Sequence, residues 1–297
     1  MQPAVRRERV IALLVRTAGV SAIVLLLMIF AFLMLQGTPA LVTVPLEVLA
    51  GARWYPPEGL YGLTPLLGGS LLVTVGAALL AVPLGLATAI FIAEVAPRSV
   101  REVLKPFIEI LAGLPSVMLG FLGIVVLAPE LYRLLDLPTG LTAFTGAVLL
   151  GWIAIPTIVS VAEDALDAVP RTYREAALAM GATRWQMIWR VTLPAARGGV
   201  LTAVMLGVGR AFGETMAVVM VTGNAAVVPR GLGSLFEPAR TMTATIAAEM
   251  GEVAVGSTHY HVLFLIGILL FVISLAVNLV GASVVFRART RAERILS

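Results

Sequence analysis

Arg210 and Glu214 carry opposite charges inside an otherwise apolar stretch of this chain. A guanidinium can attract an oxyanion, and a carboxylate four residues later shares its helix face, so the two charges can neutralise each other. A charge at the centre of a bilayer costs about 2.5–3.5 kcal/mol on insertion scales, so neither side chain is expected to face lipid. Two interpretations stay open: a buried ion pair that fixes helix packing, or a cation facing a path for an anion, with Thr215 close by.

Small residues and hydrogen-bond donors lie near this pair in the sequence. Gly207, Gly209 and Gly213 would let another helix approach closely. Further donors for an anion are expected at four polar positions: Ser116, Thr157, Thr222 and Asn224. The first two of these follow prolines, which free backbone groups inside a membrane span.

Other ionisable groups give weaker signals for chemistry. His259 and His261 could suggest a metal, but no third ligand is nearby in the sequence, so no metal site is expected. A multispanning membrane enzyme could use Glu214, Glu249 or Glu252 as acid–base groups. The apolar stretches lack a histidine, a cysteine or a nucleophile motif, so no catalytic residue is expected. The chain has no cysteine at all, which excludes disulfides and thiolate metal sites.

The composition requires a membrane protein to position these groups. The chain has 297 residues, of which 59% are hydrophobic and 13% charged, and this is too apolar for a soluble globular domain. A bilayer core of about 30 Å needs about 20 apolar residues in a helix. The runs without charge predict six transmembrane helices, at 17–36, 66–93, 108–128, 141–162, 200–223 and 262–285. The predicted fold class is an all-α membrane protein.

The distribution of basic residues predicts the topology. Most of the 21 lysines and arginines precede span one, separate spans two and three or four and five, or follow span six. By the positive-inside rule these segments, and therefore both termini, are cytoplasmic. This gives a cytoplasmic N-terminal segment (1–16), a first helix (17–36), an outer loop (37–65), a core of five helices (66–285) and a cytoplasmic tail (286–297). The positive charge indicates orientation, and no nucleic-acid binding is expected.

The first apolar run has an alternative interpretation as a cleavable signal peptide. The run from Thr17 to Leu35 is longer than the apolar part of a signal peptide, usually 7–15 residues, and no clear cleavage site follows it. We therefore expect a retained transmembrane helix.

A polar segment at 171–194, RTYREAALAMGATRWQMIWRVTLP, separates spans four and five. Residues 172–175 and 183–186 both match a capping box, and Gly181 suits a helix C-terminus. Leu193-Pro194 is expected to mark the turn into span five, because proline suits a helix start. The pattern predicts a helix, a glycine turn and a second short helix outside the membrane. Such a unit could dock onto a partner or lie on lipid headgroups.

This segment carries the motif E-A-A-x3-G-x9-V-x-L-P, formed by Glu175, Ala176, Ala177, Gly181, Val191, Leu193 and Pro194. It resembles the cytoplasmic loop of permease subunits of bacterial ATP-binding-cassette (ABC) importers, in which the position of Val191 is usually isoleucine. The motifs at 111–116, 151–156 and 209–224 are similar to those of phosphate importer permeases. The last of them resembles the PstC type of subunit rather than its PstA-type partner.

The resemblance implies a type I ABC importer permease-like fold in the bacterial cytoplasmic (inner) membrane, with phosphate crossing by alternating access. It implies that Arg210, Glu214 and Thr215 line the translocation path. It also implies that six motif residues couple to an ATPase: Glu175, Ala176, Ala177, Gly181, Leu193 and Pro194. The implied partners are membrane lipid, a PstA-type permease, two ATP-binding subunits and an extracytoplasmic phosphate-binding protein. The chain's single lysine, Lys105, lies in no phosphate-binding loop, so ATP and magnesium are expected in the partner and no cofactor in this chain. A permease for sulfate or molybdate would share the loop and remains an alternative.

Overall fold

The computed structural model describes the backbone of residues 3–296 and the side chains of residues 11–279, together with Gly281 and Ser283. Its helices are α1 (Pro3–Thr43), α2 (Leu46–Leu49), α3 (Thr64–Ile90), α4 (Arg98–Ala112), α5 (Ser116–Leu122), α6 (Ala128–Leu134), α7 (Ala143–Asp167), α8 (Arg171–Ala179), α9 (Arg184–Met187), α10 (Leu193–Gly213), α11 (Met216–Val221), α12 (Met242–Glu249) and α13 (Thr258–Leu296). Strands β1 (Trp54–Tyr55) and β2 (Leu60–Tyr61) form an antiparallel hairpin in which Trp54 pairs with Tyr61. Short 3-10 turns lie at Pro56–Glu58 and Leu232–Phe236.

Three π-helical segments join longer helical runs. Phe91–Val95 extends α3, Gly123–Leu127 joins α5 to α6, and Ile188–Thr192 joins α9 to α10. With these segments included, the described residues contain six helical runs long and apolar enough to cross a membrane: Ile11–Thr43, Thr64–Val95, Ser116–Leu134, Ala143–Asp167, Arg184–Gly213 and Thr258–Leu279. The prediction of six transmembrane helices is confirmed.

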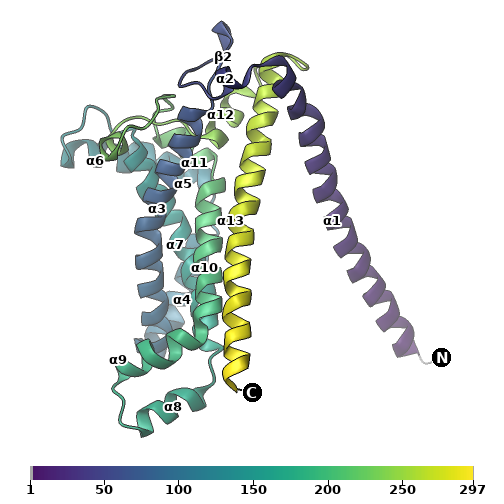
Figure 1. Ribbon diagram of the computed structural model, residues 1–297. Helices are drawn as coiled ribbons and strands as arrows, with labels where there is room; N and C mark the ends of the chain where they lie inside the picture. Colours follow the sequence, from purple (N-terminus) through teal and green to yellow (C-terminus); the bar gives the residue numbers. More distant parts are fainter. Residues whose placement is uncertain (1–2, 297) are drawn as a thin grey trace.

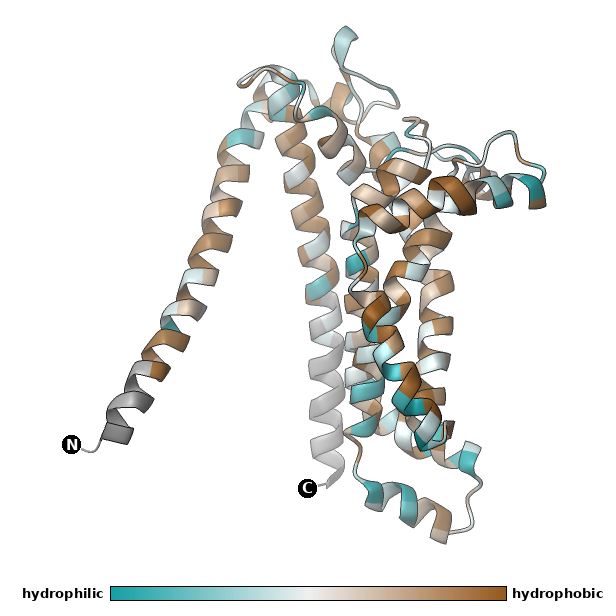
Figure 2. Ribbon diagram, turned by 180° about the vertical axis from the view of Figure 1, so that it is seen from behind, coloured by the Kyte–Doolittle hydropathy of each residue, from teal (hydrophilic) through white to brown (hydrophobic). Residues whose placement is uncertain are grey.

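The helices form an elongated bundle around α7, with α3, α10 and α4 packed beside it and α13 alongside α10 (Figure 1). We call the end with α8 and α9 the loop end, and the end with β1, β2 and α12 the cap end. Helix α1 contacts α13 near the cap end, where the rings of Phe32 and Phe264 lie 5.5 Å apart, and then leans away from the bundle. Apolar residues dominate the middle of the helices, and polar residues gather towards the ends (Figure 2).

The first and last helices are longer than the predicted spans. Helix α1 continues to Thr43 and α3 begins at Thr64, so the expected loop at 37–65 begins and ends in helix. Helix α13 continues through the expected tail at 286–297 as far as Leu296. The side chains of residues 1–10 and 284–297, including the terminal arginines used to predict orientation, lie outside the described residues.

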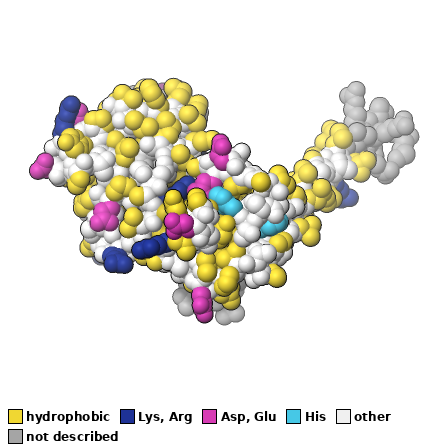
Figure 3. Space-filling view, turned by 90° about the horizontal axis from the view of Figure 1, so that it is seen from above, with side chains coloured by type: hydrophobic (Ala, Val, Ile, Leu, Met, Phe, Trp, Pro, Cys, Tyr) yellow, Lys and Arg dark blue, Asp and Glu magenta, His cyan; other side chains and the backbone are white. Residues whose placement is uncertain are grey.

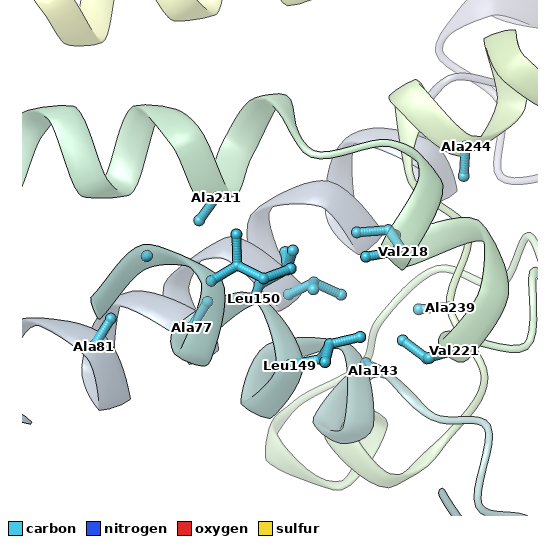
Figure 4. Packing of buried hydrophobic residues seen from close by; sticks show 14 of the residues in the cluster. Ala77, Ala81, Ala143, Leu149, Leu150, Ala211, Val218, Val221, Ala239 and Ala244 are labelled. Carbon is cyan, nitrogen blue, oxygen red and sulfur yellow. The ribbon is translucent and has the colours of Figure 1, made fainter. Parts of the chain in front are cut away.

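The core of the bundle is built from small residues packed against branched ones. Ala77 and Ala81 of α3 and Ala211 of α10 surround leucines of α7, among them Leu150 (Figure 4). Because the alanines have short side chains, the helix backbones can approach closely, which is how helices associate where lipid removes the hydrophobic driving force.

Ile158 of α7 fits between two glycines on neighbouring helices. A Cβ atom at Gly85 of α3 would lie 2.8 Å from Ile158 Cγ2, and one at Gly207 of α10 would lie 2.8 Å from Ile158 Cδ1. Ile158 is completely buried. This one side chain therefore fixes the contact of α7 with both α3 and α10, and the close approach expected at Gly207 is confirmed.

Two predicted spans are interrupted. The third, expected at 108–128, is broken at Gly113–Pro115, where α4 ends and α5 begins. The fifth, expected at 200–223, begins earlier and ends at Gly213, because the chain leaves helical geometry at Glu214 (φ −68°, ψ 133°) before α11 starts. Both errors come from treating an apolar run as one continuous helix.

The cap end is held by four side chains that we call the cap cluster: Trp54, Arg240, Glu249 and His259. Oε1 of Glu249 accepts from Trp54 Nε1 at 3.0 Å and from the Arg240 guanidinium at 2.6 Å, while Oε2 lies 2.8 Å from His259 Nε2. The cluster joins the β-hairpin region to α12 and α13. Seen from this end, charged side chains and histidines lie among apolar ones (Figure 3).

Candidate functional site

Arg210 lies in the last turn of α10 and connects three helices. Its guanidinium donates to Thr157 Oγ1 of α7 and to the backbone oxygen of Ala112, both at 3.1 Å. Ala112 is the last residue of α4, so its carbonyl has no helical partner and gains from a cation. A guanidinium has five N–H donors, and the others have no partner among the described residues.

Glu214 does not neutralise Arg210. Its Oε1 accepts from the backbone N–H groups of Thr215 at 3.1 Å and Ala217 at 3.5 Å, so the carboxylate lies at the first turn of α11. The described part of the chain shows no ion pair between Arg210 and Glu214, and the expectation that they share one helix face is wrong. The helix ends between them, which removes the four-residue relation.

The two helix breaks lie at neighbouring positions in the bundle. Arg210, four residues before the break at Glu214, reaches the carbonyl of Ala112 at the other break. Beyond the breaks, α5 packs on α11, where a Cβ atom at Gly120 would lie 3.0 Å from the Cα of Ala217. The arrangement places a cation, a carboxylate and two helix starts in one region.

The structure places only some of the polar residues expected near Arg210 close to it. Thr157 lies beside the guanidinium, and Thr215 Oγ1 donates to the Gly213 carbonyl at 3.3 Å. Thr222 is buried and donates to its own helix, and the Asn224 amide donates to the Val219 carbonyl at 2.6 Å. The donor groups of Thr222 and Asn224 are thus already engaged within the chain.

The face of α10 that carries Arg210 is open. No heavy atom of the described chain, apart from the local backbone, lies within 4 Å of a Cβ atom built at Gly209 or Gly213. The Arg210 side chain and the neighbouring Leu206 are exposed. A guanidinium buried in lipid would be costly, so this face calls for a polar or proteinaceous neighbour.

The polar segment at the loop end forms α8, a turn and α9, as predicted. Gly181 has φ +83°, the left-handed geometry expected at a helix end. The capping box at 183–186 is confirmed, because Gln186 N–H donates to Thr183 Oγ1 at 3.3 Å and Thr183 N–H to Gln186 Oε1 at 2.9 Å. The box at 172–175 is wrong, since Pro170 is the residue that precedes α8 and both box residues lie inside the first turns.

Leu193-Pro194 does not form a turn. Helix α9 continues through the π-helical segment Ile188–Thr192 into α10, so that Arg184–Gly213 is one helical run. Pro194 lacks the N–H that would bond the Arg190 carbonyl, and the wider π geometry lies immediately before it. The second predicted helix is therefore the start of the fifth span.

Apolar side chains are exposed at this end of the molecule. Met180 at the turn is 88% exposed, and Trp185 and Trp189 are more than half exposed. Glu175 and Ala176 on α8 are exposed as well, and Ala177 is half-buried. Solvent-exposed apolar groups beside a sharp turn indicate a surface that another molecule covers.

Charged side chains attach α8 and α4 to the bundle. Arg174 of α8 pairs with the buried Glu94 at 2.8 Å. Glu163 of α7 is also buried and accepts from Arg101 at 2.5 Å and from Lys105 at 2.8 Å. The hydrogen bond to Glu163 raises the pKa of Lys105 above its ordinary value.

A family model described as "Binding-protein-dependent transport system inner membrane component" matches residues 81–290. The chain belongs to this family. The permease also resembles characterised or named relatives over most of its length. It is 35% identical over 295 residues to the phosphate transport system permease protein PstC of Mesorhizobium japonicum, covering 93% of this chain and 89% of the relative. It is 43% identical over 232 residues to the probable ABC transporter permease protein YqgH of Bacillus subtilis, covering 77% and 74%.

Solved structures share the permease fold. A chain of the bacterial alginate ABC transporter, in complex with its alginate-bound periplasmic protein, has a TM-score of 0.63 at 16% identity and covers 98% of this permease and 96% of that chain. A chain of the inward-facing MetNI methionine ABC transporter has a TM-score of 0.60 at 19% identity and covers 79% and 99%. The fold is that of a type I ABC importer permease.

Sequence reasoning missed the permease's buried carboxylates. Glu94 and Glu163 lie at or near the ends of apolar helices, where each bounds a charge-free run of the sequence. Their partners, Arg174, Arg101 and Lys105, are 58 to 80 residues away in sequence. Glu94 gives a signal as an isolated acidic residue flanked by apolar ones, because burial of a carboxylate requires a cationic partner, whereas Glu163 is followed by Asp164 and lacks this signal.

The two histidines of the permease face different partners. His259 belongs to the cap cluster, and His261 Nδ1 lies 2.7 Å from the Gln36 carbonyl oxygen. Each ring thus helps to fasten a neighbouring segment to the start of α13.

Proposed function

We propose that this permease is the PstC-type membrane subunit of an ATP-driven importer of inorganic phosphate. The observation that carries the proposal is the 35% identity over 93% of the chain with a phosphate transport permease. Phosphate transport permease proteins from other bacteria are 31–36% identical to it. Sequence similarity over this much of the chain covers the core and both helix breaks, so it supports the assignment of the cargo as well as that of the fold.

Arg210 is the residue that we assign to the cargo. Its guanidinium is exposed on an open helix face, keeps N–H donors without a described partner, and sits beside two bare glycines. A phosphate oxyanion suits this fork of donors. A second, PstA-type permease covering this face would enclose Arg210 and leave the path between the two chains. Glu214 and Thr215 shape the path at the break, where the carboxylate discourages anions from binding too tightly.

The loop end supplies the coupling to ATP. In this proposal it is cytoplasmic, as are both termini, and the surface around Met180 and Glu175 docks onto one of two ATP-binding subunits. ATP and magnesium bind there, and nucleotide-driven closure favours one of two arrangements of the permeases because the ATPase binds them unequally. An extracytoplasmic phosphate-binding protein delivers the cargo at the cap end. The complex resides in the cytoplasmic membrane.

The contacts of the candidate acid–base residues argue against an enzyme. Glu249 is engaged by three donors in the cap cluster, and Glu214 accepts from two backbone N–H groups. A permease for sulfate or molybdate differs from the proposal only in cargo, and competition experiments separate the three anions.

Uptake by the reconstituted four-component system tests the proposal. Proteoliposomes containing this permease, its partner permease and the ATPase take up radiolabelled phosphate when the binding protein and internal ATP are present. Arg210→Ala lowers uptake by at least roughly tenfold, the factor expected from losing a hydrogen bond to a charged group. Arg133→Ala is the control and should leave uptake unchanged, because among the described residues Arg133 pairs only with Glu130, in an exposed ion pair.

Two results would overturn this assignment. Uptake of sulfate or molybdate in preference to phosphate refutes the cargo while leaving the permease class intact. Equal phosphate uptake by the Arg210→Ala variant and the parent, at equal amounts in the membrane, refutes the role of Arg210.

A further inference from the structure

A single guanidinium holds α8 against the membrane helices. Arg174 donates through Nε and Nη2 to Oε1 of Glu94, at 3.0 and 2.8 Å. The same group donates to the carbonyl of Leu166 at 2.8 Å and to that of Val169 at 2.6 Å. Four hydrogen bonds from one side chain thus reach two other segments of the chain.

These segments are the loop-end termini of two core helices. Glu94 lies in the π-helical segment Phe91–Val95 that ends the α3 run, and Leu166 lies in the last turn of α7. The Glu94 side chain is only 4% exposed and that of Arg174 17%. The carbonyls at the end of α7 favour a cation, although that of Leu166 also accepts from the Val169 N–H at 3.2 Å, and the buried carboxylate requires a cation. The Arg174 guanidinium thus supplies hydrogen-bond donors both to the buried carboxylate and to the α7 carbonyls.

Little else attaches α8 to the bundle. None of the α8 side chains, all of which the structure describes, is buried, and turns at Pro170 and Gly181 flank the helix. A cavity of about 430 Å³ separates part of α8 from the ends of α3 and α7, with Arg174 and Glu94 on its wall. Without Arg174, the two turns would allow α8 to swing into this space.

We propose that the Arg174–Glu94 pair is the mechanical joint that makes α8 move as one body with the ends of α3 and α7. This inference rests on the proposed function, in which α8 receives the movement of an ATPase subunit. Arg174 and Glu94 are positioning residues: they contact neither cargo nor nucleotide, and they pass displacement of α8 to the ends of α3 and α7, of which α7 contacts Arg210 through Thr157. Loss of the joint uncouples ATP hydrolysis from transport without detaching the ATPase.

The neighbouring network at Glu163 provides a matched control. It lies at the same end and joins α4 to α7, and among the described residues its ion pairs include no residue of α8. Lys105→Gln removes one charge from this network, and Glu163 keeps Arg101 as its partner. Like Glu94→Gln, this change removes one charge at the loop end, although from a side chain that is 38% exposed.

The first experiment measures cargo moved per ATP consumed. Glu94→Gln retains an acceptor oxygen but removes the charge, and Arg174→Lys retains the charge but loses the planar fork of donors. Because phosphate is both cargo and hydrolysis product, hydrolysis is followed by ADP release and import by radiolabelled external phosphate. Each variant lowers the import-to-hydrolysis ratio roughly tenfold, within the usual range of coupling between sites. The ATPase still co-purifies, and Lys105→Gln keeps the parent ratio.

A second experiment reads the joint directly and does not depend on the cargo. The chain has no cysteine, so Phe91→Cys in the segment that ends the α3 run and Ala179→Cys at the end of α8 give one pair of spin labels in this chain, both at exposed positions. In the parent complex the distance between the labels stays the same with and without bound ATP. In the Glu94→Gln complex the distance distribution broadens.

The outcomes separate the two proposals. A parent complex that keeps the label distance fixed but imports no phosphate retains the joint and refutes the proposed cargo. A label distance that changes with ATP in the parent overturns the joint, whatever is imported. Unchanged import-to-hydrolysis ratios in both variants, or an equal loss in Lys105→Gln, also overturn it.

Discussion

Replacing Gly207 with alanine tests the packing at the centre of the bundle. The added methyl group would lie 2.8 Å from Ile158 Cδ1 and closer still to Cγ1. Carbon atoms at rest lie 3.5–4.0 Å apart, and Ile158 is fully buried between α3 and α10, so it cannot rotate away. Separation of the helices or an unfavourable rotamer must absorb the overlap.

The expected cost follows from overpacking. Extra methyl groups in a well-packed core cost about 1–3 kcal/mol. Alanine also has a higher helix propensity than glycine by about 1 kcal/mol, which offsets part of this cost. Gly209→Ala carries the same propensity gain two residues further along α10, where a methyl group meets open space. The difference between the two variants therefore isolates the clash, at about 1–3 kcal/mol in favour of the Gly209 variant.

Unfolding of the purified full chain by titration with a denaturing detergent measures this difference, with tryptophan fluorescence as the signal. Ile158→Ala alone should cost about 2–5 kcal/mol because it opens a cavity. Combined with Gly207→Ala it should cost less than the two separate changes together, because the new methyl group enters that cavity. Equal free energies of unfolding for the Gly207 and Gly209 variants, or strict additivity with Ile158→Ala, would refute the packing argument.

Three further predictions concern the two ends of the molecule. Thr183→Ala removes the cap of the Arg184–Gly213 run and should cost about 1 kcal/mol, seen as faster amide exchange at the start of that run, whereas Thr172→Ala should change nothing. Trp54→Phe removes a hydrogen bond to a carboxylate in the cap cluster and should destabilise by about 1.5–3 kcal/mol in thermal unfolding; an unchanged melting temperature would contradict the cluster's role. Lys105 has a folded-state pKa raised above 10.5 by Glu163, so its contribution is complete below that value and is lost only as pH rises past the folded pKa. The stability difference between the parent and Lys105→Gln should thus be constant from about pH 6 to pH 9, and a drift across that window would speak against the pair.

The sequence predicted the features that depend on local composition. The length of the apolar runs was sufficient to predict six spans. The turn at Gly181 and the helix cap at Thr183 were predictable because each depends on the residue type at that position. The helix breaks were missed for two reasons. Pro115 can kink a helix as well as end one, and Glu214 fits the interior of a helix as readily as the residues before the start of the next helix. The pairing of Arg174 with Glu94, 80 residues apart, depends on how α3 and α7 end side by side. No local pattern encodes that proximity.

The attachment of the chain's beginning to its core has an evolutionary consequence. The family match begins at residue 81, so α1 and the β-hairpin precede the part of the chain that the family model matches. Trp54 lies in this preceding region, whereas Glu249, Arg240 and His259 lie within the matched part. The cap cluster therefore constrains the residue types on both sides of this boundary. Among relatives, loss of the early region should be accompanied by exchange of Glu249 and Arg240, because the carboxylate and the guanidinium would otherwise lose the tryptophan that covers them.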